Sequence, residues 1–406
     1  MNAPPDDLLA PDAVADPHAF FARLREHAPV HWSARHRAWL LTSHAEVSAA
    51  LRDNSLSTAR MDAFAARLAP ARREALAPAL DLLRGWMLFN DPPAHDRMRA
   101  PVARAFTPRR VEKLRGAIEQ VVDELLAAFE ARGGGDFVAE LAHPLPAIVI
   151  ADLFGVPKAD RDMLVRWSAK FGVIVFGATE RADYEQKARE AGLELRDYVA
   201  WLVAQRKAAG ELGDDLLGAL LATAGTQDGL REEELAGACS LLLFAGHDTT
   251  ASLLGSSVNA LLRDDAARAA FPRDADDPRA PAAIEELLRF EGPAKIMMRR
   301  ALHAHERGGR RIEAGHTIFM ALGAANRDPA VFAQPDRLDL ARSPNPHVAF
   351  GDGIHFCLGA PLARLEARIA LTRLFARFPK LALAREEVRW RATISDRSLV
   401  ELHVAI

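Results

Sequence analysis

Cysteine is scarce in this 406-residue sequence, which contains only Cys239 and Cys357. Two cysteines cannot form the disulfide framework of a small secreted protein. Charge of one sign is not in excess either, because 52 lysines and arginines face 55 aspartates and glutamates, for a net charge of −3. This balance offers no support for a general nucleic-acid-binding protein. Half of the residues are hydrophobic, so we expect a globular chain with a large core.

Long hydrophobic runs are also missing. The longest apolar stretch extends from Leu235 to Gly246, which is too short to span a bilayer, so we expect no membrane association. Residues 1–7 are acidic and proline-rich, without the basic and apolar regions of a signal peptide. We therefore expect a cytoplasmic protein. No repeat or low-complexity linker divides the chain, which predicts a single domain over residues 1–406.

Helical patterns dominate the sequence. The longest one extends from Arg231 to about Arg263, begins with three glutamates and is apolar on most faces, which predicts a central buried helix. Strand-like stretches are short, with a hairpin expected over 30–42 and strands over 297–302 and 317–322. The stretch 54–90 has no clean period and contains prolines, so we expect a long, partly ordered connection there. Shorter helices are expected over 17–27, 44–52, 93–106, 110–132, 145–154, 160–171, 180–208, 215–222, 282–290 and 358–378. The predicted fold class is mainly α with small β-sheets (α+β).

Cys357 ends a glycine-punctuated loop that directly precedes one of the expected helices. Gly351 and Gly353 allow backbone angles that are closed to other residues, so the loop can fold back sharply beneath a flat ligand. The helix N-terminus places a positive partial charge beside Cys357, which favours the metal-binding thiolate. A thiolate with an open face above it suits haem iron. For an isolated cysteine, a small buried residue near a helix start would be the preferred interpretation.

The pattern Phe-Gly-x-Gly-x-His-x-Cys-x-Gly resembles the haem-binding loop of the cytochrome P450 family. In this sequence its positions are filled by Phe350, Gly351, Gly353, His355, Cys357 and Gly359. The resemblance implies that Cys357 ligates the iron of haem b (iron protoporphyrin IX). It also implies the fold of that family, with the haem between the long central helix and the cysteine-bearing loop.

The central helix contains glycine, acid and threonine residues that are poor choices for a helix interior. Thr249 can bond back to the carbonyl of Ala245 and so open the helix, while Gly246 makes room for a diatomic ligand on iron. Asp248 and Thr249 offer an acid and a hydroxyl for delivering protons to reduced oxygen. A helix-packing notch with a buried, paired aspartate is the alternative. Together with the cysteine loop, the stretch resembles the oxygen-activation motif of the family, and His247 lies off this face as a structural residue.

Haem propionates need cationic donors if they are buried. His95 and Arg99 are spaced i, i+4 and share a helix face, and their surroundings resemble the propionate-binding helix of the family. Arg299 and His355 occupy the two other positions at which the family binds propionates.

A carboxylate and a guanidinium lie one turn apart at Glu286 and Arg289. The pair resembles the Glu-x-x-Arg pair of the family, which has a structural role, and Arg337 is the expected third member. Glu285 could also reach Arg289 by its spacing, so it is the family register that selects Glu286.

The substrate is not specified by these motifs. We expect it to contact the stretches 54–90 and 167–185, the central helix at Phe244 and the strand after Pro293. Ala294 leaves space beside Lys295, which shares the strand face of Arg299 and could bind an acidic substrate. The alternative is that the flexible Lys295 stem carries its ammonium to solvent.

The resemblance implies a haem-thiolate monooxygenase that inserts one oxygen atom from O₂ into a small to medium-sized, mostly hydrophobic substrate. No glycine-rich phosphate loop or zinc spacing stands out, which argues against a flavin or nicotinamide domain, so we expect electrons from a ferredoxin and its reductase. A basic set is the expected docking surface on the monomer, namely Arg109, Arg110, Lys113 and Arg364. A peroxide-driven peroxygenase and a non-catalytic haem-based sensor are the alternatives.

Overall fold

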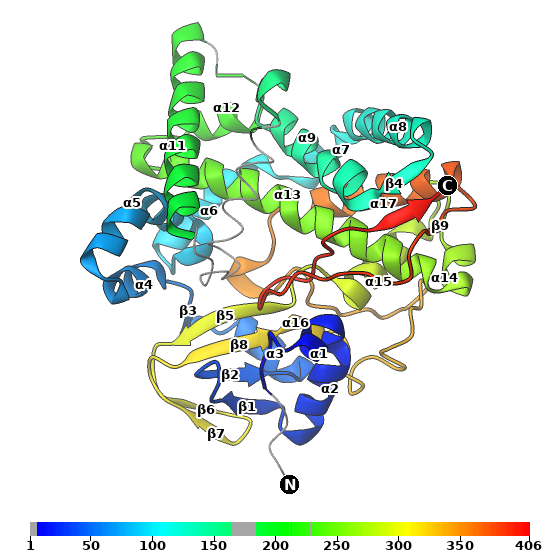
Figure 1. Cartoon of the computed structure of the whole chain (residues 1–406). Coiled ribbons are helices and arrows are strands. Elements are labelled where there is room, and N and C mark those ends of the chain that lie inside the picture. Colours follow the sequence, from blue (N-terminus) through cyan, green and yellow to red (C-terminus); the bar gives the residue numbers. More distant parts are fainter. Residues whose placement is uncertain (1–5, 162, 164–183, 211, 214, 227–228) are drawn as a thin grey trace. The chain divides into compact units, whose positions relative to one another are not determined.

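The computed structural model describes residues 6–161, 163, 184–210, 212–213, 215–226 and 229–406 (Figure 1). The chain divides into two compact units, each built from several segments. Unit 1 comprises Met1–Ser57, Ile118–Ala142 and Thr249–Ile406, and unit 2 comprises Thr58–Ala117 and His143–Asp248. Two long helices, α8 (Arg115–Ala131) and α13 (Glu232–Leu262), continue from one unit into the other. The expectation of a single domain stays a prediction.

A five-stranded sheet with the strand order β1-β2-β8-β5-β3 forms the centre of unit 1. Its strands are β1 (Val30–Ser33), β2 (Ala38–Leu41), β3 (Leu56–Ser57), β5 (Ile296–Ala301) and β8 (Thr317–Ala321). β1 and β2 form an antiparallel hairpin, β2 lies parallel to β8, and β5 lies antiparallel to β8. The predicted hairpin and the two later strands are confirmed to within one residue at their ends.

Alternating side chains of this sheet pack on its two faces, as the pleat requires. Leu40 belongs to a cluster with Phe20 and Phe21 of α2 (Pro17–His27). The next residue, Leu41, belongs to the opposite cluster, which includes residues of α3 (His44–Leu51). Helices therefore cover both faces of the sheet.

The rest of unit 1 consists of helices and two small sheets. The sheets are β4-β10-β9 and the hairpin β6-β7. Their strands are β4 (Gly134–Asp136), β6 (His305–Arg307), β7 (Arg310–Ile312), β9 (Ala382–Leu383) and β10 (His403–Ala405). The other helices are α1 (Pro11–Ala15), the π-helix η2 (Val138–Ala142), α14 (Asp265–Ala270), α15 (Ala280–Glu291), α16 (Leu322–Ala325), the 3₁₀ helix η4 (Gly353–His355) and α17 (Ala360–Arg377).

Among the described residues of unit 2, the regular elements are all helices. Its helices are α4 (Met61–Arg67), α5 (Pro70–Arg84), α6 (Ala94–Ala105), α7 (Pro108–Glu112), α9 (Pro144–Leu153), α11 (Tyr184–Ala209) and α12 (Leu216–Leu221), with short 3₁₀ helices η1 (Met87–Phe89) and η3 (Lys158–Asp160). Together with the small sheets of unit 1, they confirm a fold that is mainly α.

The expectation of a long, partly ordered connection over 54–90 is wrong. Most of it is helical, and α5 continues through Pro78. Proline removes a backbone hydrogen bond and disfavours a helix interior. The buried residues Leu76 and Leu80 of α5 pack in one cluster with Ala188 of α11, so tertiary packing stabilises the helix where the local sequence does not.

Two other predicted helices are not found as single helices among the described residues. The helix expected over 110–132 is divided into α7 and α8, and the side chain of Thr107 caps α7 by accepting from Arg110 N. The helix expected over 160–171 lies almost entirely outside the described residues. The others are confirmed, with shifts of a few residues at some ends.

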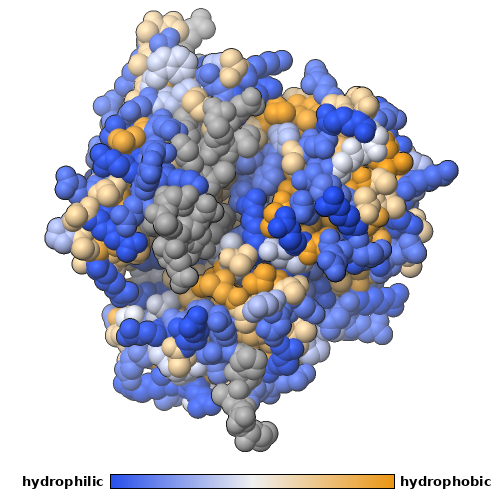
Figure 2. Space-filling model, viewed as in Figure 1, coloured by the Kyte–Doolittle hydropathy of each residue, from blue (hydrophilic) through white to orange (hydrophobic). Residues whose placement is uncertain are grey.

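Hydrophilic side chains cover most of the face shown in Figure 2, with hydrophobic residues in separate patches between them. Within the described ranges, none of the helices combines the length and the apolar character that a membrane span requires.

Candidate active site

The cysteine loop, residues 350–359, lies in unit 1 just before α17. It closes on itself, because Cys357 N donates to the carbonyl of Phe350 at 3.0 Å. Gly351 and Gly353 have φ angles of +71° and +67°, in the left-handed region that favours glycine. The sharp fold of this loop is therefore specified by its two glycines, as the sequence predicted.

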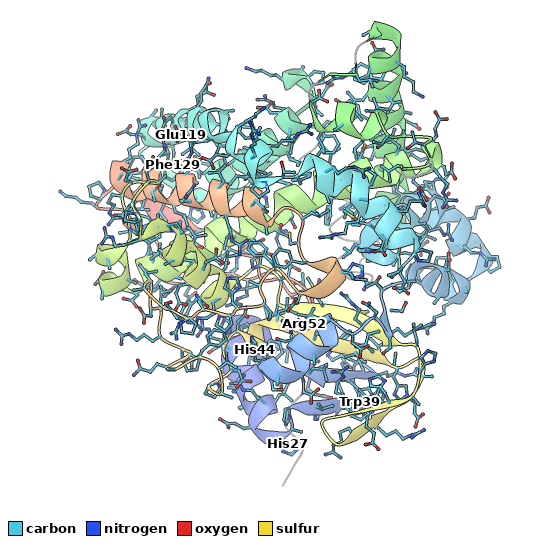
Figure 3. All side chains as sticks on the ribbon, turned by 180° about the vertical axis from the view of Figure 1, so that it is seen from behind. His27, Trp39, His44, Arg52, Glu119 and Phe129 are labelled. Carbon is cyan, nitrogen blue, oxygen red and sulfur yellow. The ribbon has the colours of Figure 1, made fainter. Side chains whose placement is uncertain are left out.

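The end of α3 anchors this loop. A Cβ at Gly353 would lie 2.8 Å from the carbonyl oxygen of Leu51, so a larger residue would push the loop away. Arg52, labelled in Figure 3, binds the Asp352 carboxylate with Nη2–Oδ2 at 2.6 Å. Asp352 Oδ1 in turn accepts from Gly353 N at 2.7 Å. The loop thus has a fixed conformation before any ligand is considered.

The two thiols of the chain lie in opposite environments. Cys239 is buried, and burial raises the pKa of its thiol to about 12, so it is inert. Cys357 is exposed and lies three residues before Ala360, the first residue of α17. The chain therefore offers one accessible thiol, at a helix N-terminus, as haem ligation requires.

Strand β5 presents a cation and a thioether in unit 1. Arg299 is buried and its Nη1 donates to the carbonyl of Met298 at 3.0 Å. The Sδ of Met297 would lie 3.7 Å from a Cβ at Gly351, so β5 lies against the cysteine loop. A buried guanidinium is the kind of group that binds a propionate. His355 lies in η4 of the same loop and is half-buried.

Helix α6 of unit 2 carries the two other predicted propionate ligands. His95 is buried, and its Nδ1 lies 2.8 Å from Oδ1 of Asp96. Arg99, one turn later, is half-buried. Both side chains have the donor groups that a carboxylate ligand needs, and they share one helix face.

An ion pair connects α6 with the start of α13. Both guanidinium nitrogens of Arg97 lie 2.5 Å from the carboxylate oxygens of Glu234. Burial alone would raise the pKa of Glu234, but hydrogen bonds from Arg97 and Arg231 outweigh it and hold that pKa at about 2. This bidentate pair fixes the register between the two helices that carry predicted site residues.

Helix α13 is buried along almost its whole length. From Glu234 to Leu261, all within the described part of the chain, the exposed residues are Ala245 and Thr249 alone, with Ala236 and Gly246 half-buried. Ala245 and Thr249 are one turn apart and therefore share a helix face. The predicted oxygen-activation stretch thus coincides with the place where this buried helix is accessible.

The glycine in this stretch has a packing role as well. A Cβ at Gly246 would lie only 3.0 Å from Cδ1 of Ile150, so α9 packs closely on α13 at this point. This contact agrees with the packing alternative for Gly246. Its predicted role toward a diatomic ligand stays a prediction.

Asp248 is only 7% exposed, beside the accessible Thr249. His247 is 3% exposed, and the ring of His143, at the start of α9, lies 5.3 Å from its ring. His143 lies outside every motif that the sequence offers. No spacing could have indicated it, because it lies more than a hundred residues away and meets α13 through helix packing alone.

The predicted pair of Glu286 and Arg289 is present and fully buried, with Nε–Oε2 at 2.7 Å. The predicted third member is wrong. Arg337 contributes its carbonyl to Arg289 Nη2, while its guanidinium contacts Gln334. Arg342 binds Glu286 instead, with Nε–Oε2 at 3.0 Å. Arg342 was not recognised because the side chain that reaches a buried carboxylate depends on the path of the irregular segment.

Glu285 does not compete for Arg289. It binds Arg364 at 2.6 Å and His347 at 2.9 Å. Burial would raise the pKa of Glu285, but the hydrogen bonds from Arg364 and His347 hold it at about 2. The guanidinium of Arg364 also lies 4.5 Å from the Phe350 ring centroid, so this arginine supports the cysteine loop. Of the expected docking set, Arg109, Arg110 and Lys113 are exposed.

Lys295 lies inside unit 1 at 5% exposure, and its Nζ donates to the carbonyl of Thr393 at 2.7 Å. Burial lowers the pKa of Lys295 to about 8, against the opposing charge of Asp396. The alternative that its ammonium reaches solvent is therefore wrong. Ala294 lies next to it and forms an isolated bridge with Asp396.

Phe244, the other expected substrate contact, is buried on α13. Its ring centroid lies 5.5 Å from that of Trp86. The indole of Trp86 also donates to Ser240 Oγ at 2.7 Å, which ties the segment after α5 to α13. Of the expected substrate stretch 167–185, residues 167–183 lie outside the described residues.

Known proteins are similar to this chain in both sequence and fold. The family model described as Cytochrome P450 matches residues 278–390. Cytochrome P450 107B1 of Saccharopolyspora erythraea is 41% identical over 411 residues, covering 98% of each chain. Nocardicin C N-oxygenase of Nocardia uniformis subsp. tsuyamanensis is 42% identical over 402 residues, covering 97% of this chain and 96% of the relative. The solved structure of the Bacillus subtilis 168 bacillaene polyketide synthase cytochrome P450 PksS has a TM-score of 0.86 at 35% identity and covers 100% and 99% of the two chains.

The chain belongs to the cytochrome P450 family. Its fold is the fold of that family, and its relatives are bacterial monooxygenases and hydroxylases. It is an O₂-dependent oxidoreductase, a haem-thiolate monooxygenase whose cofactor contains haem iron and which acts on a small molecule with a redox partner.

Proposed function

We propose that this monooxygenase uses haem b to insert one oxygen atom from O₂ into a small to medium-sized, mostly hydrophobic substrate. Electrons come from a ferredoxin and its reductase. When bound, the haem supplies the iron at which O₂ is reduced and oxygen is transferred. The observation that carries the proposal is the accessible Cys357 in its preformed glycine loop, in a chain whose other thiol is buried.

The residues of this chain would hold the cofactor in the following way. Cys357 provides the thiolate ligand, stabilised by the N-terminus of α17. The proposed ligands of the propionates are Arg299, His355, His95 and Arg99, which would donate charged hydrogen bonds to them. Arg299 is buried, and its guanidinium offers the forked pair of donors that a carboxylate accepts, which supports this assignment.

Asp248 and Thr249 deliver the protons that oxygen activation requires. Thr249 is exposed on the accessible face of α13, so its hydroxyl can donate a proton on that face of the helix. Asp248 precedes it in the helix and is almost fully buried, which shields the carboxyl group from free exchange with water. Its proton is therefore available for Thr249 while bulk water is kept out.

Phe244, Ala294 and Lys295 are the proposed substrate contacts. Phe244 offers an aromatic surface, and Ala294 leaves room beside Lys295. An acidic group of the substrate would compete with the Thr393 carbonyl for the Lys295 ammonium. The exposed Arg109, Arg110 and Lys113 are the proposed contacts for an acidic ferredoxin, which opposite charge would steer to this surface.

The iron ligand can be tested by spectroscopy. The reduced CO complex of the purified protein should show the strongly red-shifted Soret band of thiolate ligation. Cys357→His should abolish this band, whereas the matched variant Cys239→Ala should keep it, because that thiol is buried and inert. A thiolate band that persists in Cys357→Ala would refute the assignment.

Proton delivery is tested by the coupling of oxygen consumption to product. Thr249→Ala should bind ligands normally but release peroxide, because the donor hydroxyl is lost, and Asp248→Asn should slow oxygen activation. Full coupling in both variants would support the packing alternative. Turnover with ferredoxin and reductase, compared with peroxide alone, separates a monooxygenase from a peroxygenase, and a sensor would show neither.

A further inference from the structure

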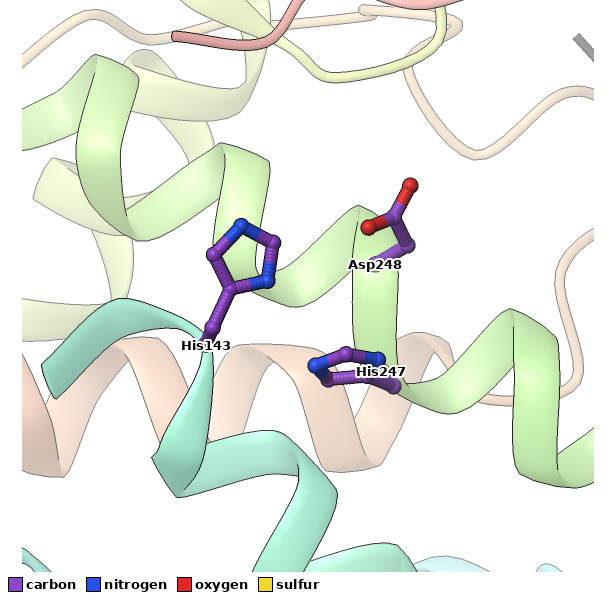
Figure 4. A group of neighbouring side chains, drawn as sticks. All are labelled: His143, His247 and Asp248. Carbon is purple, nitrogen blue, oxygen red and sulfur yellow. The ribbon is translucent and has the colours of Figure 1, made fainter. Parts of the chain in front are cut away.

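Three side chains with metal-binding atoms meet in unit 2 next to the accessible face of α13. Figure 4 shows His143 at the start of α9 and His247 with Asp248 on α13. One donor atom from each residue lies within 4.8 Å of the other two. The rings of His143 and His247 are 5.3 Å apart, at an interplanar angle of 58°.

Helix packing produces this arrangement. His247 and Asp248 are consecutive in a helix, so their side chains leave it about 100° apart. A single ion between them needs a third ligand from a neighbouring element. The close approach of α9 to α13, where a Cβ at Gly246 would lie 3.0 Å from Ile150, brings His143 to this position.

We propose that His143, His247 and Asp248 form a binding site for one divalent transition-metal ion of the zinc type. Two imidazoles and a carboxylate are a donor set that Zn²⁺ binds, with Zn–N and Zn–O distances of about 2.0–2.2 Å, whereas Mg²⁺ and Ca²⁺ prefer oxygen donors alone.

The geometry requires only a small adjustment. In a tetrahedral zinc site with bonds of about 2.1 Å, the donor atoms lie about 3.4 Å apart. The donor atoms observed here lie within 4.8 Å of one another, so side-chain rotations that move them by about 1–1.5 Å complete the site. The three residues leave the fourth position to water. His247 and Asp248 are buried, while His143 is half-buried, so the ion enters from the side of His143.

Occupation of this site has a consequence for turnover, which rests on the proposed function of Asp248. Zinc bound to the Asp248 carboxylate occupies the oxygen atoms through which this residue would serve Thr249. Zinc is therefore an inhibitor of oxygen activation that acts away from the haem iron and its thiolate. The binding itself does not depend on this role and is measured separately.

Binding is tested on the haem-loaded protein after treatment with a chelator and dialysis. Calorimetric titration with Zn²⁺ should show one site, with no comparable binding of Mg²⁺. His143→Ala and His247→Ala should each weaken the affinity at least tenfold, and His143→Asp, which keeps a ligand atom, should retain more affinity than His143→Ala.

A matched control removes a histidine from another neighbouring pair. The rings of His27 and His31 lie 6.3 Å apart on the surface of unit 1, so His27→Ala should leave the affinity unchanged. Equal zinc affinity in wild type and His143→Ala, or a loss confined to His27→Ala, would overturn the site. An unchanged far-UV spectrum and CO difference spectrum show that His143→Ala has folded and loaded haem.

The inhibition is measured as reductant-driven oxygen consumption. Zinc should reduce it in wild type and in His27→Ala, and leave it unaffected in His143→Ala at the same concentration. Site-specific binding without inhibition would overturn the link to Asp248. A protein that binds zinc at this site but consumes no oxygen would instead contradict the proposed function, so the two failures are distinguishable.

Discussion

Glu286→Gln is the substitution for which the structure gives the sharpest stability prediction. The carboxylate is 0% exposed and accepts hydrogen bonds from five donor atoms of four residues. Its Oε1 accepts from Arg289 Nη2 at 2.8 Å and from Asp339 N at 2.9 Å. Its Oε2 accepts from Arg289 Nε at 2.7 Å, Arg342 Nε at 3.0 Å and Asn345 Nδ2 at 3.2 Å.

A glutamine cannot replace this carboxylate. Whichever way its amide is turned, the NH₂ group faces donors where an acceptor was, and both guanidinium groups lose their counterion. Removing one partner of a buried ion pair costs about 3–5 kcal/mol. Arg289 also donates to the carbonyls of Asn326 and Pro335, so it cannot move to solvent without leaving these acceptors unpaired.

The assay is urea unfolding of the haem-loaded protein, followed by far-UV circular dichroism and by haem absorbance. Glu286→Gln should lower the free energy of unfolding by about 3–5 kcal/mol. The control is Asp265→Asn, whose carboxylate forms an i, i+3 pair with Arg268 but is 88% exposed, and which should change little.

A double-mutant cycle measures the interaction between Glu286 and Arg289 directly. Glu286→Gln and Arg289→Met remove the same interaction, so the double variant should lose less than the sum of the single variants, by about 1–3 kcal/mol. Additive losses, or a Glu286→Gln variant as stable as Asp265→Asn, would show that the buried network is not what stabilises this region.

Two more predictions concern close packing and pH. A Cβ at Gly237 would lie 2.5 Å from Cα of Gly85, so Gly237→Ala should lower the free energy of unfolding by about 1–3 kcal/mol in the same urea assay. Gly116→Ala, with nothing within 4 Å, should stabilise the helix slightly, and equal effects of the two variants would refute the packing argument. The pKa of Lys295 in the folded protein, about 8, lies below the ordinary lysine pKa of 10.5, so the unfolded chain binds more protons between these pH values. The free energy of unfolding should therefore gain about 3 kcal/mol from this group as pH rises through that window, and Lys295→Met should lose this slope. The same variant should bind acidic ligands more weakly in a spectral titration, and equal affinities for every acidic ligand would exclude Lys295 as their contact.

Local features of the sequence were sufficient for most of the fold and for the family. Helix and strand periods predicted α13, α17 and the β1-β2 hairpin. Each element buries apolar residues, and the spacing of these residues along the sequence indicates the type of element. The cysteine loop was equally predictable. Its glycines specify φ angles, and its cysteine and the following helix start are fixed by their order in the chain.

Only the tertiary structure decided what depends on elements far apart in sequence. Helix α5 continues through Pro78 because it packs on α11, which no local propensity contains. Arg342 rather than Arg337 binds Glu286 because the path of an irregular segment decides which side chain arrives. His143 meets His247 and Asp248 through the packing of α9 on α13. Sequence periodicity records which face of an element is buried, whereas the identity of the partner is set by long-range packing that no local pattern carries.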